Sequence, residues 1–321
     1  MKALRLKQYC QPKELQIEEV DKPTPKENEV LVKIKATAVN DYDWSMITGT
    51  PRILRLMYGI GKPKIPIPGM EISGIIEAMG SKANAFNIGD AVYGDLSEYG
   101  FGGFAEYVCI NEKALSLKPE NMSFEVAAAI PHASMLALQG LVDVGNIRKG
   151  SKVLINGAGG GVGTFGLQLA KLYDAEVTGV DTGGKLSMMV ELGFDHIIDY
   201  KKEDFTKKGQ HYDLILDTKT CRSIPKYARS LTPNGTYSTV GGDMLLILQS
   251  VLLRPFYSLF SKKRIRLVML QTNKDLDYIH ELYANGQIKP IIDGPYPFNE
   301  IQKAIQRFGE CKHTGKVVVT I

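Results

Sequence analysis

The stretch Lys152-Val-Leu-Ile-Asn-Gly-Ala-Gly-Gly-Gly-Val-Gly-Thr-Phe-Gly-Leu-Gln-Leu-Ala-Lys171 decides the fold of this chain. Val153 to Ile155 is an apolar run typical of a buried strand, and it leads directly into a glycine-dense turn. The turn opens a segment whose apolar residues recur at helical spacing. This order indicates dinucleotide binding, because glycine lets the backbone approach a pyrophosphate and the N–H groups of the first helical turn face the anion.

The glycine fingerprint fits the turn in two registers. The first, Ala158-x-Gly160-x-x-Gly163, begins where the strand ends. The second, Gly161-x-Gly163-x-x-Gly166, lies deeper in the expected helix, so we favour the first. We therefore expect the cofactor to lie against a turn formed by Ala158, Gly159, Gly160, Gly161, Val162 and Gly163.

Three residues downstream bear on the choice between NAD and NADP. Asp181 ends the next apolar run, where a carboxylate can accept hydrogen bonds from the adenosine ribose and repel a 2′-phosphate. Lys185 and Tyr200 favour the opposite choice, because both can reach such a phosphate from neighbouring loops. Asp181 can instead be the N-cap of the helix that follows. The cofactor preference stays open at this point.

A second pair of glycines follows a later strand. Gly241 and Gly242 come after the run Thr236–Val240, at the sheet edge where backbone must approach the nicotinamide ribose. A plain tight turn is the alternative interpretation of the pair.

Length and composition exclude several classes of protein. The 321 residues are enough for two domains, and 44% hydrophobic with 23% charged residues is typical of an ordinary globular protein. A net charge of +4 from interspersed residues does not indicate a nucleic-acid partner. The four cysteines are far apart, and the charged N-terminus does not resemble a signal peptide. We therefore expect a cytoplasmic protein.

The pattern along the chain predicts an α/β fold with two domains. The pattern of the first 120 residues predicts a β-rich region. From about Ser123 predicted strands and helices alternate, as in a parallel sheet that is covered by helices on both faces. A final strand over 316–321 is expected to close back onto the N-terminal part. We assign 1–122 with 272–321 to a β-rich domain and 123–271 to a doubly wound, nucleotide-binding domain.

The segment Met244–Phe260 is almost wholly apolar and precedes the basic run Lys262-Lys-Arg-Ile-Arg266. It is shorter than the roughly 20 apolar residues of a membrane span. Because Arg254-Pro255 interrupts it, we expect two short helices that form a wall of the substrate pocket and favour bulky, apolar acceptors. Contact with a partner subunit, or attachment to a membrane surface through the basic residues, are the alternatives.

Motifs across nearly the whole chain resemble the zinc-independent quinone oxidoreductase branch of the medium-chain dehydrogenase/reductase superfamily. They are Ala38-Val-Asn40 with Asp43, Pro68-Gly-Met-Glu-Ile-Ser-Gly74, Ile88-Gly-Asp-Ala-Val92, Gly103-Phe-Ala-Glu-Tyr-Val108, Ala129-Ile-Pro131, the turn at 157–163 and Gly193-Phe-Asp-His-Ile-Ile-Asp-Tyr200. The resemblance implies a β-rich, GroES-like catalytic domain and a doubly wound Rossmann domain that binds NAD(P)H. It also implies homodimers or homotetramers, of which we expect a homodimer.

The positions that hold zinc in the superfamily's alcohol dehydrogenases carry other residues here. The cysteine and histidine ligands of those enzymes correspond to the run Asn40-Asp41-Tyr42-Asp43 and to Met70. A catalytic zinc needs three protein ligands, which Asp43 and Glu71 alone do not supply. The lobe of four cysteines that binds a structural zinc is absent too. We therefore expect no metal site.

Without a Lewis acid, reduction of an electrophilic quinone or α,β-unsaturated carbonyl is more feasible than oxidation of ordinary alcohols. Asn40 stands where the family's asparagine lines the cleft near the nicotinamide, and Tyr42 is a candidate proton donor. Asn40 can instead cap a turn, and Tyr42 can be an ordinary surface or core residue. Leu136 stands where relatives commonly carry a threonine against the nicotinamide. That departure leaves a non-catalytic nucleotide-binding sensor or scaffold as the alternative function.

Overall fold

The computed structural model describes all residues from 1 to 321. The chain forms two compact units. Unit 1 comprises 1–132, 272–280 and 292–321, and unit 2 comprises 133–271 and 281–291. The first boundary lies at His132 and not at 122, because helix α3 (Phe124–Ala128) packs on the sheet of unit 1, where Ala128 meets Ala36 and Ala38. Residues 281–291 join unit 2, where Lys289 exchanges two hydrogen bonds with Gln168.

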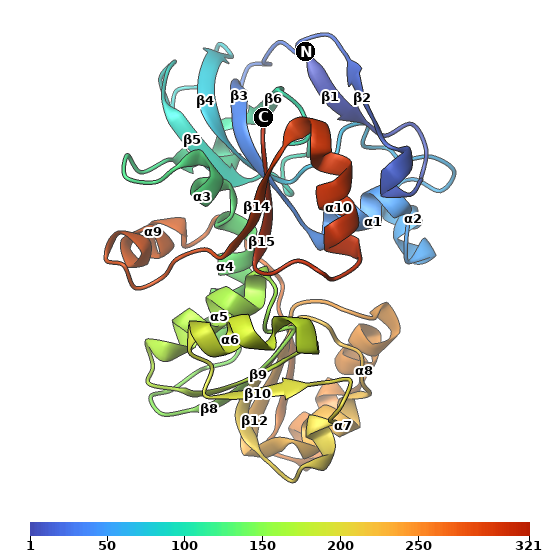
Figure 1. Ribbon diagram of the computed structural model, residues 1–321, viewed down its shortest axis with the longest axis vertical. Coiled ribbons are helices and arrows are strands. Elements are labelled where there is room, and N and C mark those ends of the chain that lie inside the picture. The colour runs from blue at the N-terminus through green and yellow to red at the C-terminus, as the bar shows by residue number, and fades with distance from the viewer. The chain divides into compact units, whose positions relative to one another are not determined.

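Unit 2 is built on a six-stranded parallel sheet (Figure 1). In spatial order the strands are β10 (His196–Asp199), β9 (Glu176–Asp181), β8 (Lys152–Asn156), β11 (Tyr212–Asp217), β12 (Leu231–Thr239) and β13 (Arg264–Leu267). The order reverses between β8 and β11, as in the doubly wound Rossmann fold, whose ligands bind at the carboxyl ends of the strands beside this reversal. The glycine-rich turn follows β8, so it lies at this position.

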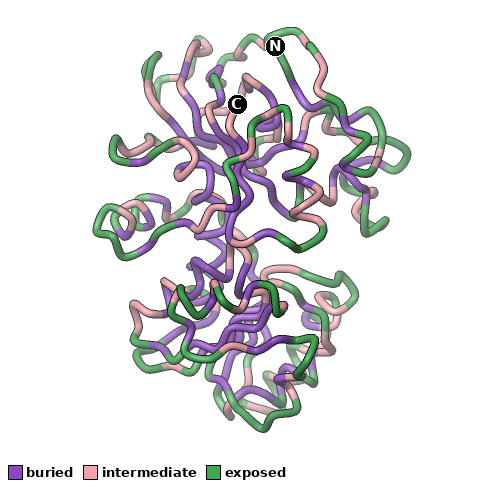
Figure 2. The backbone as a smooth tube through the Cα atoms, in the orientation of Figure 1, coloured by how far each residue is buried: buried purple, intermediate pink, exposed green.

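Helices cover both faces of this sheet. They are α5 (Gly161–Lys171), α6 (Leu186–Leu192), α7 (Ile224–Arg229) and α8 (Met244–Phe260). Successive strand residues point to opposite faces. On one face Leu154 and Ile215 share a buried cluster with Tyr227 of α7. On the other, Gly166 of α5 lies so close to Ile155 that an added Cβ would meet its side chain at 3.2 Å. The strands are therefore buried from both sides (Figure 2), which explains their continuous apolar runs.

The apolar segment forms one helix and not the two that we expected. Helix α8 runs unbroken through Pro255 from Met244 to Phe260. Proline removes the N–H that would bond to the carbonyl of Val251, but Val251 is itself exposed, so water can satisfy that carbonyl. The helices are all too short or too polar to serve as membrane spans, α8 included.

Unit 1 is dominated by antiparallel strands. Its seven-stranded sheet has the order β14 (Ile292–Pro297), β15 (Lys316–Thr320), β3 (Glu29–Val39), β4 (Glu71–Met79), β5 (Ala91–Asp95) and β7 (Ser116–Leu117), with β6 (Tyr107–Asn111) paired to β3. A hairpin of β1 (Lys2–Arg5) and β2 (Gln16–Glu19) adds a second, small sheet. Because β15 pairs with β3, the C-terminal strand closes onto the N-terminal region, as predicted.

The remaining helices are α1 (Asp41–Thr48), α2 (Arg55–Tyr58), α4 (Pro131–Leu138), α9 (Leu276–Ala284) and α10 (Ile301–Gly309). Helix α10 buries Ile301, Ala304 and Ile305 in a cluster with Val317 and Val319 of β15. This packing holds β15 in place, and with it Lys316, the first residue of that strand.

Candidate functional site

The glycine turn of unit 2 presents an open helix end. Gly160 is the N-cap of α5, at φ −91° and ψ 179°, and it has no side chain with which to cap the helix. The first turn of α5 carries no acidic residue. Its N–H groups and the positive end of the helix dipole are therefore available to an external anion such as a pyrophosphate.

Gly163 serves the close packing of this turn. A Cβ added at Gly163 would lie 2.4 Å from the carbonyl oxygen of Gly157 and 2.5 Å from that of Ala158. This contact joins the turn to the first turn of the helix, which fits the register that begins at Ala158. The second register would assign this packing role to Gly166, whose added Cβ meets only side chains.

Asp181, at the end of β9, is hydrogen-bonded to the glycine-rich turn. Its Oδ2 accepts the N–H of Gly159 at 2.8 Å, and its Oδ1 lies 3.7 Å from Nζ of Lys185. Both side chains are buried. Asp181 is not a helix N-cap, because the short helix 183–185 begins after Thr182. Tyr200 follows β10, where its N–H donates to the Asp181 carbonyl oxygen. The structure thus brings Asp181, Lys185 and Tyr200 to one edge of the turn.

Gly242 has a structural reason to be glycine. It has φ +129°, and a Cβ there would lie 2.3 Å from the backbone nitrogen of Thr220. Gly241 has no such constraint, since the nearest atom to its added Cβ is 3.9 Å away. The tight-turn interpretation therefore accounts for Gly242, and only Gly241 is left without a structural explanation.

Unit 1 contains a buried ion cluster, formed by Asn40, Glu71 and Lys316. Nζ of Lys316 lies 2.5 Å from Oδ1 of Asn40 and also donates to Oε2 of Glu71. Nδ2 of Asn40 donates to the same carboxylate oxygen at 2.7 Å. The backbone N–H of His132 donates to Oε1 of Glu71 at 2.6 Å. All three side chains are nearly inaccessible, so the ammonium balances the carboxylate inside the protein.

Asp43 supports the chain around this cluster. Its carboxylate accepts the N–H of Asn40 at 2.9 Å and that of Gly69 at 3.0 Å. Burial raises the pKa of Asp43 to about 7, although these two donors oppose the shift. Asp43 thus joins the start of α1 to the loop before β4, and it is a structural hydrogen-bonding residue.

His132 and Asp95 form a second buried pair beside the cluster. Nδ1 of His132 lies 2.8 Å from Oδ2 of Asp95. Burial alone would lower the pKa of His132, but the hydrogen bond and charge of Asp95 outweigh it and raise that pKa. The ring of Tyr42 meets the His132 ring edge-on at 5.9 Å, while Tyr42 itself is 47% exposed. Tyr42 therefore touches both solvent and the buried pair.

This pair predicts a pH-dependent contribution to stability. Because the folded-state pKa of His132 is raised above its ordinary value of 6.5, its contribution is complete below that pH and is lost as pH rises through the raised pKa. We expect His132→Gln to reduce the free energy of unfolding more at about pH 5.5 than at about pH 8.5. Urea denaturation at both pH values measures this. A loss that is equal at the two values would contradict the imidazolium–carboxylate pair.

Sequence reasoning missed two members of these clusters. Lys316 begins an apolar strand, and Asp95 ends one, so neither differs from an ordinary solvent-facing end residue in the sequence. His132, at the start of an apolar helix, is buried and hydrogen-bonded, as is usual for a core histidine. Leu136, the departure from the family's threonine, is buried in α4.

Comparisons with known proteins agree with this architecture. Residues 26–120 match the alcohol dehydrogenase GroES-like domain family, and residues 192–319 match the zinc-binding dehydrogenase family. The chain is 31% identical over 307 residues to 2-methylene-furan-3-one reductase of Solanum lycopersicum, covering 92% of this chain and 73% of that protein. It is 30% identical over 308 residues to the chloroplastic NADPH-dependent alkenal/one oxidoreductase of Arabidopsis thaliana, with the same coverage.

Among solved structures, the quinone oxidoreductase from Coxiella burnetii superposes with a TM-score of 0.88 at 25% identity, covering 100% of this chain and 99% of that chain. The sequence motifs, the two domain types and these relatives lead to one conclusion. The chain belongs to the quinone oxidoreductase-like branch of the medium-chain dehydrogenase/reductase superfamily.

Proposed function

We propose that this protein is an NAD(P)H-dependent reductase of quinones or α,β-unsaturated carbonyls. The observation that carries the proposal is the open N-terminus of α5, where Gly160 leaves the first helical turn uncapped beside the buried Asp181–Lys185 pair. This is a donor set for the pyrophosphate and ribose of a dinucleotide. The reductases of Solanum and Arabidopsis named above support the substrate class.

NAD(P)H bound at the glycine turn would supply a hydride for an electrophilic carbon, and the residues of the protein would position the acceptor and provide a proton. We propose Tyr42 as the proton donor, because its partly exposed ring lies against the buried His132. The side chain of Asn40 is bonded to Lys316 and Glu71, so we assign it a positioning role at the start of α1. Gly241 is proposed to let the backbone approach the nicotinamide ribose.

We further propose that the reaction uses no zinc, although one matching family is described as zinc-binding. The donor chemistry at this position does not suit a cation. Glu71 already binds the Lys316 ammonium, both Asp43 oxygens accept backbone N–H groups, and Nδ1 of His132 is bonded to Asp95. A zinc ion would have to displace a buried positive charge. Tightly bound, stoichiometric zinc in the purified protein would overturn this proposal.

Cofactor preference depends on Asp181 and Lys185. Because the two side chains pair, Asp181→Ser should remove the charge that repels a 2′-phosphate and also release Lys185 to bind it. We expect the ratio of NADPH to NADH affinity to rise about tenfold, or 1–2 kcal/mol, as is ordinary for one charge near a partly solvated phosphate. Fluorescence titration with both cofactors measures this ratio.

Asp181→Asn is the matched control for that experiment. Asparagine keeps an acceptor for the N–H of Gly159, so it separates the loss of charge from the loss of the turn's hydrogen bond. If Lys185→Ala abolishes an existing NADPH preference while Asp181→Ser and Asp181→Asn change nothing, the carboxylate has no role in the choice.

Turnover distinguishes the reductase from a non-catalytic sensor or scaffold. The purified protein is mixed with NADPH, or NADH, and either a simple quinone or an enal, and cofactor oxidation is followed by absorbance. We expect oxidation that requires the acceptor. Cofactor binding without turnover across both acceptor classes would favour the sensor, for which Leu136 is the supporting residue. We also propose a cytoplasmic homodimer, which sedimentation analysis of the same sample tests.

A further inference from the structure

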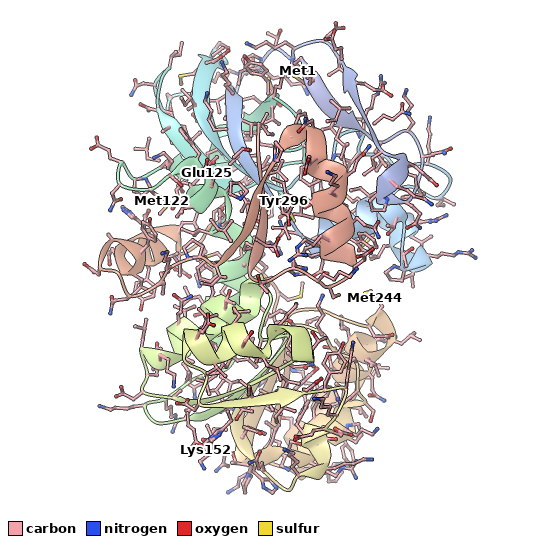
Figure 3. All side chains as sticks on the ribbon, in the orientation of Figure 1. Met1, Met122, Glu125, Lys152, Met244 and Tyr296 are labelled. Carbon is pink, nitrogen blue, oxygen red and sulfur yellow. The ribbon has the colours of Figure 1, made fainter.

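Helix α8 has two apolar faces, and only one of them is covered. Leu253 and Tyr257 pack against the core of unit 2, and Ser250, one helical turn before Leu253, is buried. The opposite face carries a stripe at spacings of three and four residues, here called the α8 stripe: Leu245, Leu248, Leu252, Phe256 and Leu259. These side chains are between 53% and 77% exposed. Figure 3 marks the start of this helix at Met244.

Such a stripe is unusual for a surface helix, whose outer face is normally polar. Scattered exposed leucines need no explanation, but five aligned apolar side chains along one helix form a contiguous surface. Phe260, which follows the stripe at the end of the helix, is 70% exposed. We therefore expect the α8 stripe to be covered by a binding partner.

The charges along the segment that carries the stripe are predominantly positive, although Asp243 precedes the helix and caps it by accepting the N–H groups of Leu245 and Leu246. Between Met244 and Gln271 there is no acidic residue, whereas the same segment holds five basic ones: Arg254, Lys262, Lys263, Arg264 and Arg266. Burial and the positive charges of Arg254 and Arg264 lower the pKa of Arg266, and no carboxylate offsets them. Lys262, two residues after the helix ends, is exposed. An anionic partner would relieve this repulsion.

We propose that the α8 stripe and the adjoining basic residues bind the surface of a lipid bilayer that contains anionic headgroups. An apolar helical face with flanking Lys and Arg lies in the interface plane, with its apolar side chains among the acyl chains and its cations at the headgroups. Helix α8 does not span the bilayer, because it has only 17 residues and its other face belongs to the protein core.

A second copy of this chain is the competing occupant of the stripe. A two-fold contact through this surface would bring two predominantly basic segments toward each other, and their net repulsion would oppose association. A bilayer with anionic lipid meets both requirements at once, because it offers apolar volume and negative charge. The charge of the segment therefore favours the membrane over self-association.

Flotation of the full-length protein with vesicles tests the proposal. We compare vesicles of phosphatidylcholine alone with vesicles that also contain phosphatidylserine. We expect at least about tenfold more bound protein with the anionic vesicles, and a loss of this difference at high salt, because exposed charges are screened. Equal binding to both vesicle types, or binding to neither, would overturn the proposal.

Two variants separate the apolar and the charged contributions. Leu252→Gln/Leu259→Gln should reduce binding to anionic vesicles about tenfold, since both side chains are exposed and glutamine preserves helix propensity. Lys262→Gln/Arg264→Gln should reduce binding to anionic vesicles alone.

The matched controls are Val190→Gln, which changes an exposed apolar residue of α6, and Lys149→Gln/Lys152→Gln, which removes two exposed charges elsewhere in unit 2. Both should bind as the wild type does.

Two other results would assign the stripe to a different occupant. If Leu252→Gln/Leu259→Gln converts a dimer to a monomer in sedimentation and leaves vesicle binding unchanged, the stripe is an interface between copies. If it raises KM for lipophilic quinones and leaves vesicle binding unchanged, the stripe is the pocket wall expected from the sequence. Either result overturns the membrane assignment. Circular dichroism of every variant shows that α8 and the fold are intact before these comparisons are made.

Discussion

Gly160→Val is expected to weaken binding of NADPH and NADH at least about a hundredfold, or by about 2.7 kcal/mol, while the protein stays folded. The added methyl groups would stand at the N-cap of α5, where the pyrophosphate has to approach the backbone. Valine fits the backbone itself, because φ −91° and ψ 179° lie in the extended region that β-branched residues prefer. Fluorescence titration measures the affinity, and thermal unfolding without cofactor measures the fold.

Two other glycines control this experiment. Gly61→Val adds a side chain in open space far along the chain, since no atom lies within 4 Å of its added Cβ, and it should leave affinity unchanged. Gly163→Ala should instead damage the fold, because its Cβ would collide with two backbone carbonyl groups. If Gly160→Val binds both cofactors as tightly as Gly61→Val does, the glycine turn is a structural loop and the cofactor assignment fails.

The cofactor half of the molecule could be predicted because its signals are local. The apolar run, the glycines and the amphipathic helix of 152–171 are contiguous, and each constrains the next. The strand predicted at 153–155 falls within β8 and differs from it by one residue at each end, and Asp181, predicted to end the next apolar run, is the last residue of β9. The sequence did not predict the hydrogen bond between the Asp181 carboxylate and the N–H of Gly159. This contact requires β8 and β9 to be adjacent, as the parallel sheet makes them.

The prediction for α8 was wrong because a local rule was given too much weight. Proline at position 255 suggested a break, but the helix residues that precede it are mostly strong helix formers, and Leu253 and Tyr257 pack on the core on either side of it. The sequence also indicated that so apolar a segment must be covered. The structure places only one face of it against the core.

The buried clusters of unit 1 lay beyond sequence reasoning for a different reason. Asn40 directly follows β3, whereas Glu71 and Lys316 begin β4 and β15, and only the pairing of these three strands brings the three residues together. A lysine at the start of an apolar strand is usually solvated, so nothing in the sequence marks Lys316 as buried. The sequence predicts no set of zinc ligands here, but it gives no sign of the cation that balances Glu71.

Lys316→Met is therefore expected to lower the free energy of unfolding by about 3–5 kcal/mol, the usual cost of removing one partner from a buried ion pair. Methionine fills most of the volume of the lysine stem, so the loss would come from the unbalanced Glu71 carboxylate and not from a cavity. Urea unfolding of the wild type and the variant measures it. Lys303→Met is the control, because Lys303 pairs with Glu300 on the surface of α10 and its loss should cost less than about 1 kcal/mol.

A second substitution decides whether charge is the cause. Lys316→Met/Glu71→Gln removes both charges and leaves an amide that can still accept the N–H of His132, so it should recover much of the stability lost in the single variant. If Lys316→Met is instead as stable as Lys303→Met, Glu71 does not need the ammonium, and another cation must balance it. Stoichiometric zinc in that variant would then identify the cation and restore the metal mechanism. Without zinc and with recovery in the double variant, Lys316 is the positive charge that balances Glu71 in the interior of unit 1.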